Sequence, residues 1–328
     1  MQNHFNASVA KLAAFGMFVL AATMACASAF AAFPEKPLRL VVPFPPGGGT
    51  DIIARTLGVA MSKELGEAVV IDNRPGAGTI IGTEFVAKSP ADGYTLLVAT
   101  FAHVINPSMQ PKLPYSWDKG FAPVILIGRG PNVLVVAASS PYRNLQDVIA
   151  AARAQPGKLT YASYGYGTSG HLAGEMFTNL ARVDITHVPY KGAAQAITDI
   201  LGGQADMIFG TAAAVASFVG SGKLRPIGVT SPSRSPSLPN VPAIGESVSG
   251  YSVESWYGIY VPAGTPPDVV ARLNAAIGAA TKNEDFRRRI EPEGIAITGG
   301  KPAELDEFVR AEEARWRRIV RENKIKPE

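Results

Sequence analysis

Short runs of β-branched and aliphatic residues alternate with helical patterns along the chain, and this alternation limits the possible folds more than any other feature. Strands separated by helices predict an α/β fold with mixed, mostly parallel sheets. Each run is bounded by glycine, proline or polar residues, which end strands. The predicted strands are 38–42, 69–71, 95–99, 133–136, 159–162, 185–188, 207–209, 227–229 and 258–261.

Helix signals lie between these strands. Asn144 and Asp147 are spaced as a cap pair at the start of an apolar stripe. Thr265-Pro266-Pro267-Asp268 signals the start of a second predicted helix, because proline is favoured in a first helical turn. A third helix is predicted after Pro302, with acidic residues at its start and arginines at its end, which complements the helix dipole.

The chain is long enough for two lobes. Its 328 residues are 47% hydrophobic and 18% charged, which is a globular composition. The stretches 128–131 and 253–256 are predicted to cross between the lobes. The first lobe would then comprise residues 33–130 plus 256–328, and the second lobe residues 131–255.

The N-terminus has the pattern of a secretory signal. Lys11 precedes an apolar run over residues 12–25, and small residues end at Ala31. These features predict a signal peptide over residues 1–31 and a periplasmic mature chain. The alternative is a membrane anchor, but about 14 apolar residues fall short of the ~20 that span a bilayer.

Cysteine content and charge exclude several classes of protein. Cys26 is the only cysteine and lies in the predicted signal peptide, so the mature chain would have no disulfide and no thiol chemistry. A lipoprotein site at Cys26 fits poorly, because Thr23 stands where leucine is usual. The net charge of +4 is dispersed, which argues against nucleic-acid binding and is compatible with an anionic ligand.

The first candidate ligand site is the glycine-rich turn at residues 43–51, between a predicted strand and a predicted helix. Backbone N–H groups at such a turn can approach an anion, and a helix start favours negative charge. No Lys-Ser/Thr follows the glycines, so this is not a Walker loop. The alternative is a tight turn in which Thr50 or Asp51 caps the helix.

A second glycine-rich turn, residues 163–171, repeats the arrangement. Its G-x-G-x-x-G pattern matches the dinucleotide-binding fingerprint, with Asp184 near the position of the ribose-binding acid. One such fingerprint is weak evidence, and an exported protein is not normally supplied with NAD, so we expect no cofactor. Thr168 and Ser169 would instead offer hydroxyl donors to a ligand.

An exported hydrolase that uses Ser169 and His171 is the alternative function. The G-x-S-x-G elbow is absent, and a serine two residues before a histidine at a helix start usually caps the helix. The four histidines, His4, His103, His171 and His187, lack metal-ligand spacing. We expect neither catalytic residues nor a metal site.

Further motifs follow one another in order along the chain. They are PFPPGGGTD at 43–51, NRPGAG at 73–78, ADGYT at 91–95, NP at 106–107, GYGTSGHL at 165–172, VPYKG at 188–192, GQAD at 203–206 and PAGTP at 262–266. Together they closely resemble the Bug family, the periplasmic solute receptors of tripartite tricarboxylate transporters. The resemblance covers nearly all of residues 34–328.

This resemblance implies a two-lobed Venus-flytrap fold of the periplasmic-binding-protein class, type II-like, which holds its ligand between the lobes without catalysis. In such proteins the loop at residues 44–48 grips a ligand carboxylate through backbone groups and ordered waters. The ligand would be a di- or tricarboxylate, an amino acid or an aromatic acid, the partner a membrane permease, and the protein a monomer. A sensory receptor for the same ligands is an alternative. The implied binding residues are Phe44, Pro46, Gly47, Gly48, Thr50, Thr100, Tyr166, Gly167, Thr168, Ser169, Tyr190 and Asp206.

The chain departs from the family pattern at Tyr164 and Tyr166, where small or polar residues are more usual. Their rings would narrow the distal pocket or line it with aromatic surface, which would favour an aromatic acid. The alternative is that both rings point outward and pack on a neighbouring surface, because aromatic residues do both.

Overall fold

The computed structural model describes residues 33–110, 112–322 and 325. The predicted signal peptide, residues 1–31, lies outside the described residues. Every element named below lies in the unit Pro37–Glu328. Among the described residues, no helix is both long and apolar enough to cross a membrane.

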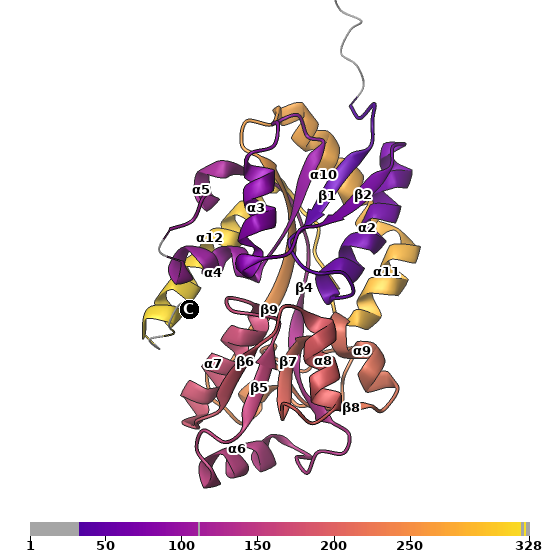
Figure 1. The fold of residues 1–328 in the computed structure, drawn as a ribbon. Coiled ribbons are helices and arrows are strands. Elements are labelled where there is room, and N and C mark those ends of the chain that lie inside the picture. The colour runs from indigo at the N-terminus through magenta and orange to yellow at the C-terminus, as the bar shows by residue number, and fades with distance from the viewer. Residues whose placement is uncertain (1–32, 111, 323–324, 326–328) are drawn as a thin grey trace, which may run out of the picture. The chain divides into compact units, whose positions relative to one another are not determined.

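The first sheet is mixed, with its parallel strands on one side (Figure 1). Its strand β1 (Leu38–Val42) pairs in parallel with β2 (Val69–Asn73) and β3 (Thr95–Thr100), and β9 (Glu254–Pro262) runs antiparallel to β3. The helices that accompany this sheet are α2 (Gly49–Leu65), α3 (Ile80–Ala87), α4 (Phe101–Met109), α5 (Trp117–Gly120), α10 (Pro267–Lys282), α11 (Glu284–Ile290) and α12 (Pro302–Glu322).

The second sheet is built around β5 (Thr160–Ser163). This strand pairs in parallel with β6 (Thr186–Pro189) and β7 (Met207–Thr211). The sheet is completed by β8 (Leu224–Val229), which pairs antiparallel with the second half of β4 (Phe121–Ala137). Its helices are α6 (Leu145–Ala154), α7 (Ser169–Ala181), α8 (Ala193–Leu201) and α9 (Ala212–Gly220).

Strand β4 (Phe121–Ala137) belongs to both sheets. Its residues up to Pro131 pair with β9, and its residues from Asn132 onward pair with β7 and β8. The sequence predicted only residues 133–136 of this strand, because glycines suggested a break before them. Those glycines instead make room for β10 (Ala296–Ile297), since a Cβ atom on Gly128 would lie 2.6 Å from the Ala296 carbonyl oxygen. One extended strand therefore runs from the first sheet into the second.

Thr230 joins the two chain segments that pass between the sheets. Its backbone N–H donates to the Asn132 carbonyl at 2.9 Å, and its hydroxyl donates to the Val253 carbonyl at 2.6 Å. The Asn132 N–H donates to the Thr230 hydroxyl oxygen at 2.7 Å. Because Thr230 is completely buried, these bonds tie both crossings together at one point.

The predicted helix starts are confirmed. Asn144 Oδ1 accepts a hydrogen bond from the Asp147 N–H at 3.0 Å, and Asp147 in turn accepts one from the Arg143 N–H at 2.7 Å. The helices α10 and α12 begin at Pro267 and Pro302, as their start signals predicted.

Aromatic packing fixes the elements that lead to the site. The Phe101 ring at the start of α4 meets the fully buried Trp316 of α12 edge-on, with ring centroids 4.8 Å apart. A separate apolar cluster, which includes Ile197 of α8 and Val215 of α9, packs these helices on the second sheet. The starts of α4, α8 and α9 are therefore anchored by buried contacts within each lobe.

Candidate ligand-binding site

A cavity of about 40 Å³ lies where strand ends from both sheets meet. None of the described residues that line it carries a formally charged side chain. They are Phe44, Pro45, Gly48, Gly49, Thr50, Thr100, Phe101, Ala102, Tyr164, Thr168, Ser169, Gly192, Ala193, Thr211 and Ser255.

Within the part of the chain that the structure describes, five helices begin at this cavity. The first or preceding residues of α2, α4, α7, α8 and α9 all belong to its lining. The first N–H groups of a helix have no acceptor inside the helix, and the helix dipole adds partial positive charge there. The cavity is therefore electropositive through its backbone, which is the environment that an anion requires.

Three of these helix starts, those of α2, α8 and α9, have no side-chain cap. Thr211 occupies the N-cap position of α9, where threonine usually accepts a hydrogen bond from the helix backbone. Its Oγ1 atom has no hydrogen-bond partner within the described part of the chain, and neither has Oγ1 of Thr100. Backbone donors and side-chain hydroxyls are thus both left for a ligand.

The first glycine-rich turn is held in shape by Asp51. Its carboxylate accepts hydrogen bonds from the Gly47 N–H, from Arg55 Nε and from Asn73 Nδ2, each at 2.9 Å. Burial raises the pKa of Asp51, but the hydrogen bonds from Arg55, Gly47 and Asn73 outweigh it and keep the pKa below its ordinary value. The ionised Asp51 therefore stabilises the conformation of the first glycine-rich turn.

The alternative in which Thr50 or Asp51 caps α2 was wrong. The N-cap is Gly48, which has no side chain to cap with. The next residue, Gly49, faces the start of α9 so closely that a Cβ atom there would lie 2.7 Å from Thr211 Oγ1. Any side chain at this position would therefore press on the start of α9.

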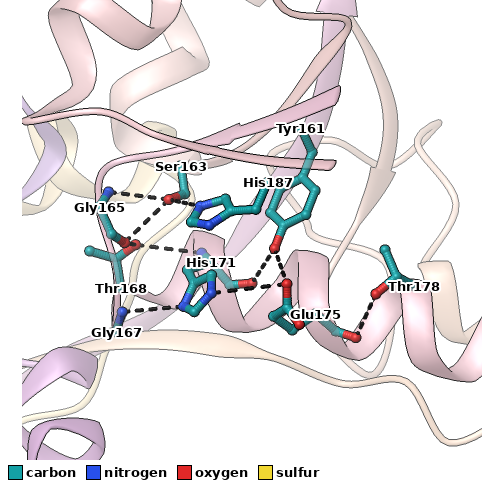
Figure 2. Close-up of polar contacts among 9 residues, drawn as sticks. All are labelled: Tyr161, Ser163, Gly165, Gly167, Thr168, His171, Glu175, Thr178 and His187. Atoms are coloured by element: carbon teal, nitrogen blue, oxygen red, sulfur yellow. Dashed lines mark hydrogen bonds and ion pairs between the residues drawn. The ribbon is translucent and has the colours of Figure 1, made fainter. Parts of the chain in front are cut away.

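The second glycine-rich turn lies beside two histidines, of which His171 is buried and His187 is half-buried (Figure 2). The Gly167 N–H donates to His171 Nδ1 at 3.2 Å, and Ser163 Oγ is hydrogen-bonded to His187 Nε2 at 2.7 Å. The two imidazole rings stack with centroids 4.4 Å apart. The Tyr166 ring lies edge-on to both, so it supports the turn from the side of the histidines.

This histidine pair should make folding stability depend on pH. Burial lowers the pKa of His187 to about 4 and that of His171 to about 3, where the charge of His187 contributes further. An unfolded chain takes up these protons near pH 6.5, so we expect a constant free energy of unfolding above about pH 7 and a decrease between about pH 6.5 and 4. The expected decrease is about 1.4 kcal/mol per pH unit for each histidine.

Urea denaturation at several pH values checks this prediction. The His187→Gln variant, which keeps a partner for Ser163, should lose less stability between about pH 6.5 and 4 than the parent chain. An equal loss in both proteins would contradict it.

The structure brings together half of the predicted binding residues. Phe44, Gly48 and Thr50 line the cavity from the first turn. From other elements, Thr100, Thr168 and Ser169 also line it.

The other predicted residues lie outside the cavity lining. Pro46 and Gly47 are exposed on the turn. Tyr166 packs on histidines, and the Gly167 N–H is used by His171. Tyr190 also lies outside the lining, and its hydroxyl donates a hydrogen bond to Asp199 Oδ2 at 2.9 Å.

Asp206 lies at the end of β7 that points away from the cavity. It precedes β7, whereas the cavity meets the opposite end of β7 at Thr211. Its carboxylate accepts hydrogen bonds from the Thr160 N–H at 2.8 Å and from the Thr160 hydroxyl at 2.9 Å. Asp206 therefore joins the starts of two parallel strands.

Sequence reasoning missed Thr211, Ser255 and the pair Gly192 and Ala193, all of which line the cavity. A signal for Thr211 was present, because it follows a predicted strand and ligand groups collect at the carboxyl ends of strands in α/β folds. Ser255 gave no comparable signal, since it stands in the predicted crossing between lobes. For the two tyrosines the outcome is divided, because Tyr164 lines the cavity and Tyr166 does not.

Comparison with known proteins identifies the family. Residues 53–325 match the model for the tripartite tricarboxylate transporter family receptor. The chain belongs to this family. The receptor is 34% identical to Protein BugT of Bordetella pertussis over 96% of this chain and 98% of that protein. A protein of the tcbD–tcbE intergenic region of Pseudomonas sp. (strain P51) is 41% identical, over 90% of this chain and 88% of that one. The predicted membership of the Bug family is confirmed.

Solved structures confirm the two-lobed fold of periplasmic binding proteins for this receptor. The periplasmic binding protein BugD is 31% identical to this chain and superposes with a TM-score of 0.86. The match covers 90% of this chain and 100% of BugD. The R. palustris protein Rpa4515, solved with adipate, is 36% identical with a TM-score of 0.87 and the same coverage of 90% and 100%. MatC from Rhodopseudomonas palustris, solved with malate, is 31% identical with a TM-score of 0.83, over 88% and 100%.

Proposed function

We propose that this receptor is a periplasmic solute-binding protein that captures a small organic carboxylate and presents it to the membrane permease of a tripartite tricarboxylate transporter. The observation that carries the proposal is the convergence of five helix starts on a cavity whose lining has no charged side chain. Backbone N–H groups form strong, charge-assisted hydrogen bonds with a carboxylate, so no salt bridge is needed.

The solved relatives support the ligand class. Rpa4515 was solved with adipate and MatC with malate, and both ligands are carboxylates. In this chain the carboxylate would be bound by the backbone N–H groups at the start of α2 and by the hydroxyls of Thr168 and Ser169, which would give up their present bonds to the Gly165 carbonyl and Asn132 Oδ1 to donate to the ligand. The predicted signal peptide and the periplasmic relatives support a periplasmic location.

Opening of the two lobes would admit the ligand. The lobes would comprise residues 33–130 plus 256–328 and residues 131–255, a division supported by the change of strand partners along β4 after Pro131. A cavity of about 40 Å³ has room for only a few water-sized groups, so entry requires the lobes to separate. The ligand then favours the closed form because only there does it contact helix starts from both lobes.

The geometry argues against the hydrolase alternative. Ser169 Oγ donates to Asn132 Oδ1 at 3.1 Å, whereas a nucleophile would be bonded to its base. The His171 Nδ1 atom accepts the Gly167 N–H, and its Nε2 atom lies 4.0 Å from Glu175. Both ring nitrogens of His171 thus face groups other than Ser169. We propose that the receptor has no catalytic residues.

Calorimetry with a panel of acids and their neutral amides tests the proposed function. The panel holds aliphatic diacids and monoacids of three to six carbons, malate and benzoate. At least one acid should bind, and its amide should bind at least about 100-fold more weakly, because an amide carries no negative charge for the helix starts to stabilise. Equal affinity of acid and amide, or no binding by any member, would disprove the proposal. Native mass spectrometry of the purified protein would show any ligand retained from the cell.

A further inference from the structure

A groove of about 440 Å³, separate from the ligand cavity, lies between α2 and α11. These two helices pack side by side (Figure 1). The groove is lined by one face of α2 from Ile52 to Lys63 and by residues of the α11 segment between Asn283 and Arg289. The lining positions on α2 recur every three or four residues, so they form a continuous stripe along the helix. We name this surface the α2–α11 groove.

Val59 lies in the middle of the α2 stripe and is 65% exposed. No other large hydrophobic residue that the structure describes is as exposed. A single apolar side chain on a flat surface requires no explanation. Val59 instead stands in a recess large enough to receive side chains of another molecule, which makes the groove a candidate contact surface.

Three cations line the groove around Val59. Arg55 and Lys63 lie one helical turn before and after it on α2, and Arg289 lines the groove from α11. Within the described part of the chain, neither Lys63 nor Arg289 forms an ion pair. The acidic residue of the lining, Asp285, is already paired with an arginine of α11. The groove therefore combines an apolar centre with an excess of positive charge.

Arg55 connects the α2–α11 groove to the first glycine-rich turn. Its Nε atom donates to Asp51 Oδ2 at 2.9 Å, and Asp51 also accepts the Gly47 N–H of that turn. The Arg55 side chain is still 52% exposed, so an acidic group from outside can reach its guanidinium. A partner in the groove is thus two contacts away from the turn that would bind the ligand. Such a position is appropriate for the molecule that receives the ligand.

The shape and charge of the groove favour an acidic protein segment over a membrane surface. Attraction to anionic lipids requires clusters of about four to eight basic side chains spread over a surface. Here three cations line a recess, which a flat bilayer cannot enter. Carboxylates on a protruding segment can pair with these cations while an apolar residue of the same segment covers Val59.

We propose that the α2–α11 groove is the docking surface for an acidic segment on the periplasmic side of the transporter's membrane permease. This inference rests on the proposed function, which supplies the permease as the partner. An apolar residue of that segment covers Val59, and its carboxylates pair with Lys63, Arg289 and the exposed side of Arg55.

Uptake of the best-binding acid by cells tests the docking surface. The receptor gene is deleted in its host, and the parent receptor or a variant is produced in its place. The Lys63→Glu/Arg289→Glu double variant should reduce uptake at least about tenfold, because its carboxylates repel those of the permease segment. Arg55 is left unchanged, since it also holds Asp51 in the ligand turn. Val59→Asp, which alters one exposed side chain, should reduce uptake as well and serves as the test if the double variant does not fold.

The Lys119→Glu/Arg318→Glu double variant is the matched control. It makes the same change in net charge at exposed residues of α5 and α12, which lie on the side of the molecule away from α2 and α11 (Figure 1). Its uptake should equal that of the parent receptor. Calorimetry should show the parent affinity for the acid in both double variants, which separates docking from ligand binding. Equal losses of uptake in both double variants would overturn the assignment to this groove.

Photo-cross-linking in living cells identifies the occupant. The receptor carries p-benzoylphenylalanine in place of Val59, and mass spectrometry identifies the cross-linked peptide. The expected product joins the receptor to a permease segment that contains Asp or Glu. A cross-link to a second copy of the receptor, to a segment without acidic residues or to no protein overturns the proposal. Binding of the parent receptor to phosphatidylglycerol vesicles that is lost in Lys63→Glu/Arg289→Glu would assign the groove to a membrane surface and overturn it too.

The outcomes separate the docking surface from the proposed function. Undiminished uptake with Lys63→Glu/Arg289→Glu or Val59→Asp overturns the docking surface and leaves carboxylate capture intact. A parent receptor that binds no acid, or that restores no uptake, overturns the proposed function and with it the docking surface.

Discussion

Replacing Gly49 by valine is expected to abolish carboxylate binding and to leave the fold of each lobe intact. A Cβ atom at this position would lie 2.7 Å from Thr211 Oγ1 and 3.2 Å from Ala213 Cβ. Valine adds two methyl groups beyond Cβ, so the starts of α2 and α9 would be forced apart. The ligand could then no longer contact both helix starts, and we expect its affinity to fall at least about 100-fold, or about 2.7 kcal/mol.

Calorimetry with the best-binding acid measures this loss, and Gly220→Val provides the matched control. Gly220 lies at the end of α9, and a Cβ atom there would meet nothing within 4 Å. The Gly220→Val variant should bind the acid with the same affinity as the parent receptor. Circular dichroism should show the same helix content for all three proteins. Binding by a folded Gly49→Val variant within about threefold of the parent would show that the close contact of the helix starts is not needed.

Gly170→Ala is expected to destabilise the second lobe strongly. Gly170 is the second residue of α7, and a Cβ atom there would overlap the carbonyl oxygen of Phe209 in the backbone of β7. A backbone atom in a central strand cannot relieve the overlap by changing a side-chain rotamer, so α7 must move away from the sheet. We expect the free energy of unfolding to fall by about 3 kcal/mol, at the upper end of the usual cost of overpacking.

The same displacement would move Thr168 and Ser169 at the start of α7, so ligand affinity should fall as well. Urea denaturation measures the stability, with Gly220→Ala as a control that adds the same methyl group in open space. A loss below about 1 kcal/mol in Gly170→Ala would show that α7 can move without cost.

The alternation of strands and helices was predictable because most strands end at clear breakers. The strand at residues 38–42 was predicted with its observed bounds. Only residues 133–136 of the long strand β4 were predicted, because its earlier part contains Pro123, Gly128 and Pro131, which usually end strands. The structure accommodates Pro123 where the register with β9 shifts, and irregular pairing of this kind leaves no clear pattern in the sequence.

The cavity was only partly predictable. Glycine-rich turns identified the starts of α2 and α7 because such turns have local sequence signatures. The contributions of Thr211 and Ser255 depend on which strands meet across the two lobes, and this pairing has no local signature. Tyr164 and Tyr166 stand two residues apart in an irregular turn, so no strand or helix period predicts which ring lines the cavity.

The absence of charged side chains from the cavity lining has a consequence for how such a receptor can diversify. Peptide N–H groups are the same whatever the side chain, so substitutions in the lining can alter which acid is accepted while the attraction for negative charge is preserved. The backbone therefore recognises the negative charge, and the side chains determine which acid binds. A new specificity can then arise by single substitutions, because each variant along the way still binds anions through its backbone.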